Sequence, residues 1–423
     1  MADISQELDP PVDCSPQEQL NKRQGAQSDR SSRRNSTSNS TYSIFPFRFK
    51  LSIAVAFLSI AIIFPSLREF PDPQFSSFLR SLPASLEHHY LKGELINIHI
   101  NQHHPPIEIF KFESENRYNA SENVLIVHGI GMSSFAFRKV VNVLENKGVH
   151  AISFDLPGHG FSKTLMEETW EERGIFEKLA SVYNLIKEKG VFWAVETAIE
   201  TGVIPYEEIE LLLPREHKVS KPAALGNNEM GKILGDLIDK LGLAPVHLVL
   251  HDSSIAMVGY WVSENPNVIK SLTLLNPSPK PAFPLGFLKL PPVFLIASRY
   301  NAVYGAVIRR CCSCGMSISD LVAHRMMFRN CAATMINKID QDFHLKNWGQ
   351  LPGVKTMPLH VISSGDWSSG WNIEKSEVAE GIGGAGFASY SGGRWPNEES
   401  SKEIGDLLYD FVSSLPKSVV NAS

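Results

Sequence analysis

The sequence is poor in cysteine, has no excess of positive charge and contains no histidine after His360. Five cysteines occur among 423 residues, and the formal net charge is −5. Because no large basic patch accompanies this balance, nucleic acid is not an expected partner. The length and the 43% hydrophobic content suffice for one large α/β domain with additional segments.

The cysteine spacing excludes the usual zinc signatures. Four of the five cysteines, namely Cys311, Cys312, Cys314 and Cys331, lie in one short stretch. A C-C-x-C run without a second C-x-x-C is a poor metal site, so neither a metal nor another cofactor is expected. Two alternatives stay open: unpaired buried thiols, or a disulfide involving Cys331 if the domain faces an oxidising compartment.

The N-terminal region predicts a tail followed by a membrane anchor. Residues 1–43 are polar and poor in large aliphatics, which is typical of disorder. Residues 51–67 carry no charge, and three phenylalanines precede them, so we expect a transmembrane helix within 44–67 and a linker over 68–91. A signal peptide and a buried core helix are the alternatives, weakened by the long tail and by the missing polar face.

Charge around this segment predicts its orientation. The basic residues that precede it are Lys22, Arg23, Arg30, Arg33, Arg34, Arg48 and Lys50, whereas only Arg68 follows it closely. The positive-inside rule then places the N-terminus in the cytosol and the main domain across the membrane. On that side, the Asn119-Ala120-Ser121 sequon could carry a glycan at Asn119.

Beyond residue 92, short apolar runs alternate with stretches of helical periodicity. This alternation predicts a mostly parallel sheet with helices on both faces, preceded by two hairpin-like strands. The expected strands are 95–100, 107–112, 124–127, 149–154, 246–250, 269–275, 359–362 and 387–390, and the expected helices are 133–146, 232–241, 254–263 and 402–413. Together they define a domain over 92–418, with helical lid insertions expected at about 165–225 and 280–350.

Two glycine-rich turns follow early strands of this pattern. His128-Gly129-Ile130-Gly131 resembles the turn through which α/β hydrolases supply a backbone N–H to an oxyanion hole. Asp155-Leu156-Pro157-Gly158-His159-Gly160-Phe161-Ser162 resembles the D-x-P-G-x-G-x-S turn of the same fold. The first turn has a simpler alternative, which is close packing of strand and helix. We therefore expect an α/β-hydrolase fold, with Gly129, Ile130 and Ser253 as the remnant of the oxyanion turn.

The nucleophile of that fold is expected directly after the strand 246–250. In the common V-G-H-[S/D]-x-G-G register Asp252 takes this position, as the carboxylate does in epoxide hydrolases and haloalkane dehalogenases. Ser253 is a rival, but that register places His251 where a small residue is needed. Leu250 departs from the pattern because glycine is usual there.

The acid and base positions follow later strands. Pro358 to Asp366 resembles the stretch that ends in the acid, so Asp366 is the candidate. Ser391-Gly392-Gly393-Arg394-Trp395 resembles the context of the base, but Arg394 occupies the histidine position. A guanidinium has donors only and cannot accept a proton; it could pair with Asp252 and Asp366 instead. A displaced base from His324, His344 or His360 is the alternative.

Several longer strings resemble the auxin response 4 family of plant proteins. They are Lys189-Gly190-Val191-Phe192-Trp193-Ala194, Ile204-Pro205-Tyr206-Glu207-Glu208-Ile209, Val246-His247-Leu248-Val249-Leu250-His251-Asp252-Ser253, Gly393-Arg394-Trp395-Pro396 and Leu415-Pro416-Lys417-Ser418. The resemblance implies a single-pass accessory protein of the endoplasmic-reticulum membrane. It also implies a need for this protein in the trafficking and polar placement of an auxin influx carrier, and hence in auxin response and root gravitropism.

Two classes of function therefore compete. The first is a chaperone-like trafficking factor with a vestigial catalytic centre at Asp252, Asp366 and Arg394, bound to a carrier and, through residues 51–67, to the bilayer. The second is an active membrane-bound hydrolase of epoxide-hydrolase type that uses Asp252. A small-molecule receptor that keeps the pocket is a weaker third.

Overall fold

The computed structural model describes the folded part of the chain in several ranges. These are 79, 81–100, 105–117, 120, 122–172, 216–222, 225–278, 296–313, 315–328, 343–365, 381–382, 385–395 and 399–416. The predicted tail and anchor, Asn119 and Asp366 lie outside them. Within them, no helix is both long and apolar enough to cross a bilayer.

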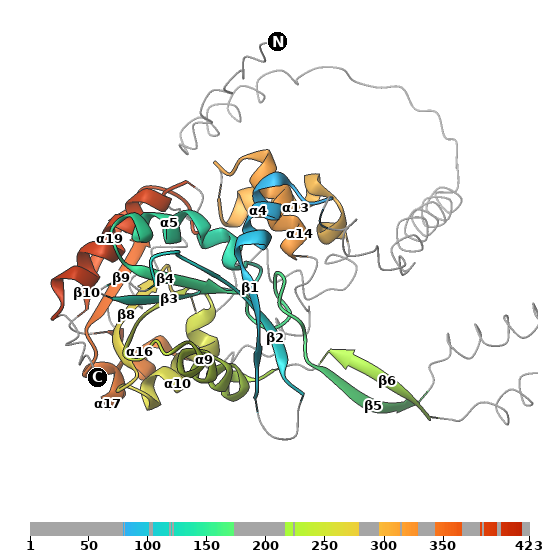
Figure 1. Cartoon of the computed structure of the whole chain (residues 1–423), viewed down its shortest axis with the longest axis horizontal. Helices are drawn as coiled ribbons and strands as arrows, with labels where there is room; N and C mark the ends of the chain where they lie inside the picture. The colour runs from blue at the N-terminus through green and yellow to red at the C-terminus, as the bar shows by residue number, and fades with distance from the viewer. Residues whose placement is uncertain are drawn as a thin grey trace, which may run out of the picture. The chain divides into compact units, whose positions relative to one another are not determined.

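An eight-stranded sheet forms the centre of the larger unit, in the order β1-β2-β4-β3-β7-β8-β9-β10 (Figure 1). The first two strands pair antiparallel with each other and β2 pairs antiparallel with β4, whereas the remaining neighbours are parallel. The strands are β1 (Glu94–Ile98), β2 (Ile107–Glu113), β3 (Asn123–Val127), β4 (His150–Phe154), β7 (Val246–His251), β8 (Ile269–Leu275), β9 (Leu359–Ser364) and β10 (Gly386–Tyr390).

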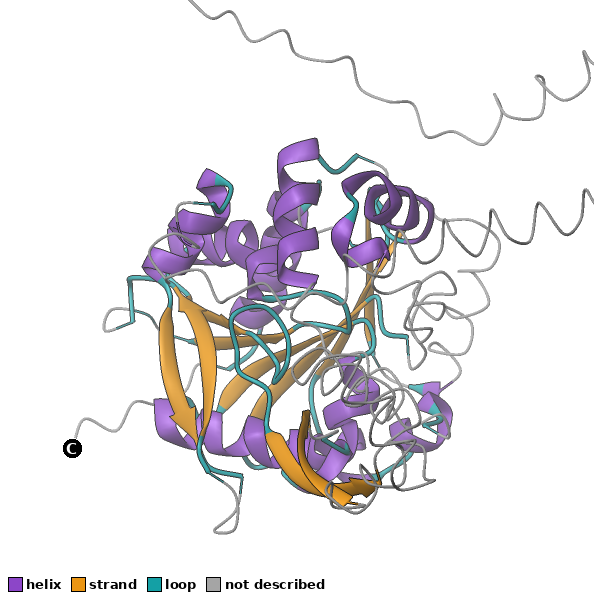
Figure 2. Ribbon diagram, turned by 90° about the vertical axis from the view of Figure 1, so that its right-hand side faces the viewer, coloured by secondary structure: helices purple, strands orange, loops and turns teal. Residues whose placement is uncertain are grey.

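Helices cover both faces of this sheet (Figure 2). The α5 and α19 helices pack together on one face, and α9 and α10 pack together on the other. A parallel sheet buries both faces, which explains why every residue of β4 and β7 is buried. The bounds are η1 (Ser134–Phe137), α5 (Arg138–Asn146), α9 (Asn227–Leu241), α10 (Ser254–Glu264), α16 (Leu345–Gly349), α17 (Pro352–Lys355) and α19 (Ser401–Ser414).

These elements confirm the predicted alternation of strands and helices. The two early strands form the expected antiparallel pair, with Ile96 opposite Ile109. Gly148 follows α5 with a φ of 78°, and Gly242 follows α9 with a φ of 64°. Glycine adopts this left-handed conformation at no steric cost, so both residues end their helices where the periodicity ends.

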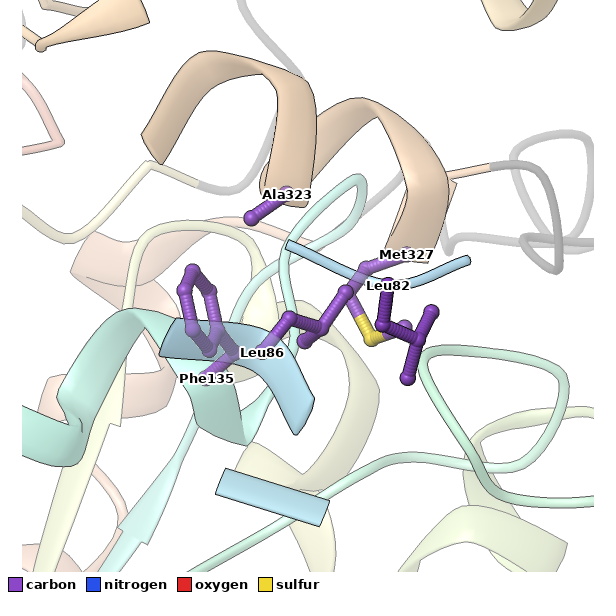
Figure 3. Packing of buried hydrophobic residues seen from close by; sticks show 5 residues of the cluster. All are labelled: Leu82, Leu86, Phe135, Ala323 and Met327. Carbon is purple, nitrogen blue, oxygen red and sulfur yellow. The ribbon is translucent and has the colours of Figure 1, made fainter. Parts of the chain in front are cut away.

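The predicted linker over 68–91 is wrong at its C-terminal end. Helix α4 (Ala84–Lys92) begins eight residues before the expected start of the domain at residue 92. Its Leu86, together with Leu82, packs against Phe135, Ala323 and Met327 in one apolar cluster (Figure 3). The short helix has weak periodicity of its own, and contacts far along the chain give it a buried side.

The first predicted insertion, 165–225, corresponds closely to a separate compact unit, Thr164–Ala224. Its described ends form an antiparallel pair, β5 (Met166–Glu172) and β6 (Glu216–Pro222), with Thr169 opposite Val219. The expectation of helices is therefore wrong at both ends of this insertion. Residues 173–215 lie outside the described ranges.

The second predicted insertion, 280–350, is helical where it is described. It contains α13 (Asn301–Cys311), α14 (Ile318–Phe328) and α16. An ion pair ties α14 to the sheet-covering helix α5: Arg138 Nη2 lies 2.7 Å from Asp320 Oδ1. Arg138 also stacks on the Phe135 ring, 3.8 Å from its centroid, so the same arginine fixes α14 beside η1.

The burial of Leu86 generates a stability prediction. Leu86→Ala should lower the free energy of unfolding by about 2–5 kcal/mol, because it removes buried methyl groups and leaves a cavity among the cluster residues. Urea unfolding of the purified full chain in detergent measures this. The matched control is Leu91→Ala in the same helix, since Leu91 is 66% exposed; it should change the midpoint little, and an equal loss in both variants would contradict the packing of α4.

Candidate functional site

Asp252 stands on the tight turn between β7 and α10 where the nucleophile was predicted. Its φ is 55°, an uncommon conformation for a residue with a side chain. Two backbone hydrogen bonds hold the turn: Asp252 N–H donates to the Leu275 carbonyl at 3.0 Å, and Ser278 N–H donates to the Asp252 carbonyl at 3.2 Å. The strained strand–turn–helix geometry of a nucleophile elbow is thus present.

The predicted oxyanion turn lies against this elbow. A Cβ atom added to Gly129 would come within 2.8 Å of Asp252 Cβ, so only glycine fits there. The next residue, Ile130, donates its backbone N–H to Ser253 Oγ at 2.9 Å. Gly129, Ile130 and Ser253 are therefore brought together as expected. However, the Ser253 hydroxyl accepts the Ile130 N–H, which is one of the two backbone donors of the oxyanion hole in this fold.

Arg394 meets Asp252 in a buried, two-pronged ion pair. Its Nη2 donates to Asp252 Oδ1 at 2.7 Å, and its Nε donates to Oδ2 at 3.2 Å. The Trp395 Nε1–H adds a third donor to Oδ2 at 3.1 Å. Asp252 is 1% exposed and Arg394 4% exposed. Such bidentate, charge-assisted bonds in a dry environment orient both groups strongly.

Asn276 holds the loop that carries Arg394, and the sequence analysis missed it. It follows β8 with a φ of 46° and is fully buried. Its Nδ2 donates to the Arg394 carbonyl at 3.0 Å, and its Oδ1 accepts the Ser364 N–H at 2.9 Å. It also bonds to the Tyr390 hydroxyl. An asparagine directly after the apolar Leu274-Leu275 end of β8 was the available signal.

The same loop contacts the turn between α13 and α14. Trp395 N–H donates to the Cys312 carbonyl at 2.8 Å, and Gly315 N–H donates to Glu399 Oε1 at 2.7 Å. Cys312 is disulfide-bonded, and its partner is not among the described side chains. One of the two alternatives for the cysteine cluster, a disulfide, is therefore present, and its pairing stays open.

Three histidines near the turns are buried and neutral. Burial lowers the pKa of His159 and of His251 to about 4, and it lowers the pKa of His128 as well. His128 Nε2 accepts the Leu156 N–H at 3.0 Å while Nδ1 lies 2.8 Å from the Gly129 carbonyl, which makes Nδ1 the protonated nitrogen. His251 Nε2 lies 3.3 Å from the Arg394 carbonyl and acts as its donor. These imidazoles support the backbone of the two turns.

The predicted alternatives for the base lie elsewhere in the structure. His324 packs edge-on against Phe135, His360 packs against Phe411 of α19, and His344 precedes α16. None of these three histidines hydrogen-bonds to Asp252. The predicted acid, Asp366, lies outside the described residues, so its contact with Arg394 stays a prediction.

Among the described residues, the side chains that hydrogen-bond to the Asp252 carboxylate are donors only. Both oxygens of Asp252 accept hydrogen bonds from cationic or indole donors, which lowers their nucleophilicity. The group that faces them has no acceptor and cannot activate a water. The Ile130 N–H is already bonded to a hydroxyl. The elbow and the two turns are thus present together with a buried ion pair at Asp252.

Known proteins share this fold. Residues 122–324 match the family described as alpha/beta hydrolase fold. Two similar solved structures are a thermophilic esterase from Thermogutta terrifontis and a bacterial membrane phospholipase A. The esterase is 12% identical with a TM-score of 0.52, covering 76% of this chain and 98% of its own. The phospholipase is 12% identical with a TM-score of 0.51, covering 88% of this chain and 97% of its own. At these identities the likeness shows the fold alone.

The buried ion pair generates a prediction from a double-mutant cycle. Arg394→Met should lower the free energy of unfolding by about 3–5 kcal/mol, because it leaves the Asp252 carboxylate buried without its cation. Asp252→Asn combined with Arg394→Met should recover much of that loss, since no unpaired charge remains. Urea unfolding of the full chain measures the cycle. Lys402→Met, which removes an exposed partner of Asp406, is the control and should leave the midpoint unchanged; additive effects at 252 and 394 would refute the coupling.

The neutral histidines generate a pH prediction. The folded pKa of about 4 for His251 lies below its unfolded value of about 6.5. Between these values the unfolded state therefore binds more protons than the folded state. The contribution of neutral His251 to the free energy of unfolding is complete above about pH 6.5 and is lost as the pH falls through 4. His251→Gln keeps a donor for the Arg394 carbonyl but does not titrate. Unfolding midpoints between pH 4 and 7 should depend less steeply on pH in this variant, and identical slopes would contradict the assignment.

Proposed function

We propose that the domain with the α/β-hydrolase fold, in which residues 122–324 match the family model, is non-catalytic and serves as an accessory of the endoplasmic-reticulum membrane. In this proposal, the protein is chaperone-like and is needed for an auxin influx carrier to reach its polar position at the cell surface. Auxin response and root gravitropism would then depend on it.

The ion pair between Arg394 and Asp252 is the observation that carries the non-catalytic part of this proposal. A working hydrolase needs a base that cycles between proton acceptor and donor, and a guanidinium cannot do so. A functional nucleophile also needs an accessible lone pair, whereas three donors contact the two Asp252 oxygens. These contacts favour a domain that has kept its architecture for purposes other than turnover.

The membrane and carrier parts of the proposal rest on other observations. The uncharged run 51–67 and the basic residues before it favour a single anchor with a cytosolic N-terminus. The disulfide at Cys312 suits a domain on the lumenal side, because disulfides persist in oxidising compartments. The carrier as partner rests on the resemblance of the strings at 189–194, 204–209 and 393–396 to the plant family.

A second candidate function is an active membrane-bound hydrolase of epoxide-hydrolase type. The retained elbow at Asp252, with its φ of 55°, and the close approach of Gly129 favour it. It would require Arg394 to leave Asp252 on substrate binding and another group to activate water. We rank it second because both charges of the pair are buried and mutually bonded.

A trafficking experiment separates these two functions. We expect the Asp252→Asn/Arg394→Gln variant, which removes both charges, to crosslink to the auxin influx carrier in plant microsomes within about twofold of the wild type. The carrier should also still reach the plasma membrane in plants that express this variant alone. The physical reason is that the ion pair is buried and cannot contact a partner directly.

The control is Lys402→Gln/Asp406→Asn, which removes the surface ion pairs of Asp406 with Lys402 on α19 and with Lys147 on α5. Protein level and unfolding midpoint are measured for both variants, so that only folded protein is compared. A folded 252/394 variant that fails to recover the carrier would contradict the proposal. Turnover of esters or epoxides by the wild type, absent in this variant, would establish the second candidate.

A further inference from the structure

The α13–α14 face is an exposed surface that the vestigial centre does not use. We define it by Tyr300, Val303 and Ile318, which are 46%, 37% and 69% exposed, and by the exposed Arg309. All four lie on α13, on α14 or directly before α13. Large apolar side chains exposed on neighbouring helices are typical of an interaction surface.

The charge on this face has one sign. Arg309 is exposed on α13, and residues 296–319 contain no aspartate or glutamate. Two acidic residues approach the same helices, and each is already engaged: Asp320 with Arg138 at 2.7 Å, and Glu399 with the Gly315 N–H at 2.7 Å. A surface that combines apolar side chains with arginines fits the interface of a phospholipid bilayer.

The chain enters the domain next to this face. Leu82 and Leu86, just before and within α4, pack against Ala323 and Met327 of α14 (Figure 3). Figure 1 shows α4 beside α13 and α14. The predicted anchor ends at residue 67, twelve residues before Leu79. At about 3.3–3.6 Å per residue, this stretch spans roughly 40 Å at most, so the side of the domain that carries α4 and α14 is the side tethered to the predicted anchor.

We infer that the α13–α14 face lies against the phospholipid surface of the membrane in which the protein is anchored. Ile318, Val303 and Tyr300 enter the headgroup region, and Arg309 meets the phosphates. This inference rests on the proposed anchor. It deepens the proposed function, because it orients the domain: the face defined by α13 and α14 turns to lipid, and the other surfaces of the larger unit stay available to a partner.

Photocrosslinking of the full chain tests this orientation. A benzophenone amino acid replaces Ile318 in one variant, and Phe387 or Tyr260 in control variants. The controls are exposed apolar residues on β10 and α10, with 54% and 40% exposure. The purified chains are reconstituted in vesicles of phosphatidylcholine with one-fifth phosphatidylserine and irradiated. We expect the yield of lipid adduct at position 318, measured by mass spectrometry, to exceed that at 260 and 387 at least tenfold.

Two outcomes of the photocrosslinking would contradict this orientation. Lipid adducts of similar yield at the three positions, or crosslinks from position 318 mainly to a second copy of the chain, would overturn the inference. As a separate measure of charge, Arg309→Gln should lower the yield at position 318 at least twofold in these vesicles.

Extraction with alkaline carbonate tests the anchor independently. A chain that is released by carbonate refutes the anchor, whereas a retained chain without adducts refutes only the orientation.

Discussion

The ion pair between Asp252 and Arg394 is the interaction on which the centre of this domain depends. A buried carboxylate costs several kcal/mol unless a cation and hydrogen bonds compensate it. The elbow after β7 places Asp252 where water is excluded, at 1% exposure. The loop after β10 must therefore bring a cation to that point, and Asn276 and Trp395 secure the loop in that position.

This requirement links three parts of the larger unit that are remote in sequence. The elbow belongs to the sheet, the loop follows the last strand, and the turn after α13 is bound to that loop through the Cys312 carbonyl. In a hydrolase, these parts surround a reacting substrate and have to leave space for it. In this chain Asp252 and Arg394 neutralise each other, and the Ser253 hydroxyl accepts the Ile130 N–H. These contacts hold the elbow, the loop after β10 and the turn after α13 together.

The strongly periodic elements could be predicted from the sequence because their burial pattern is local. The run at 124–127 is apolar throughout and the run at 246–250 is apolar except for His247, as expected for strands of a parallel sheet with both faces covered. Helix α4 could not be predicted in this way, since its buried side depends on Ala323 and Met327, far along the chain. The strands β5 and β6 could not be predicted either. Their charged sequences show no apolar alternation, and only their pairing with each other makes them strands.

By itself, the sequence determined which chemical groups are available to the site: an aspartate at the elbow, an arginine in the position of the base, and no histidine after His360. Side-chain identity is a local property, so the sequence alone shows that Arg394 offers hydrogen-bond donors and no proton acceptor. Only the tertiary structure decided that Arg394 binds Asp252 through both Nε and Nη2, across 142 residues of chain. It also decided that Ser253 occupies the Ile130 N–H. Such contacts depend on how the ends of separate strands converge, and no local pattern specifies that convergence.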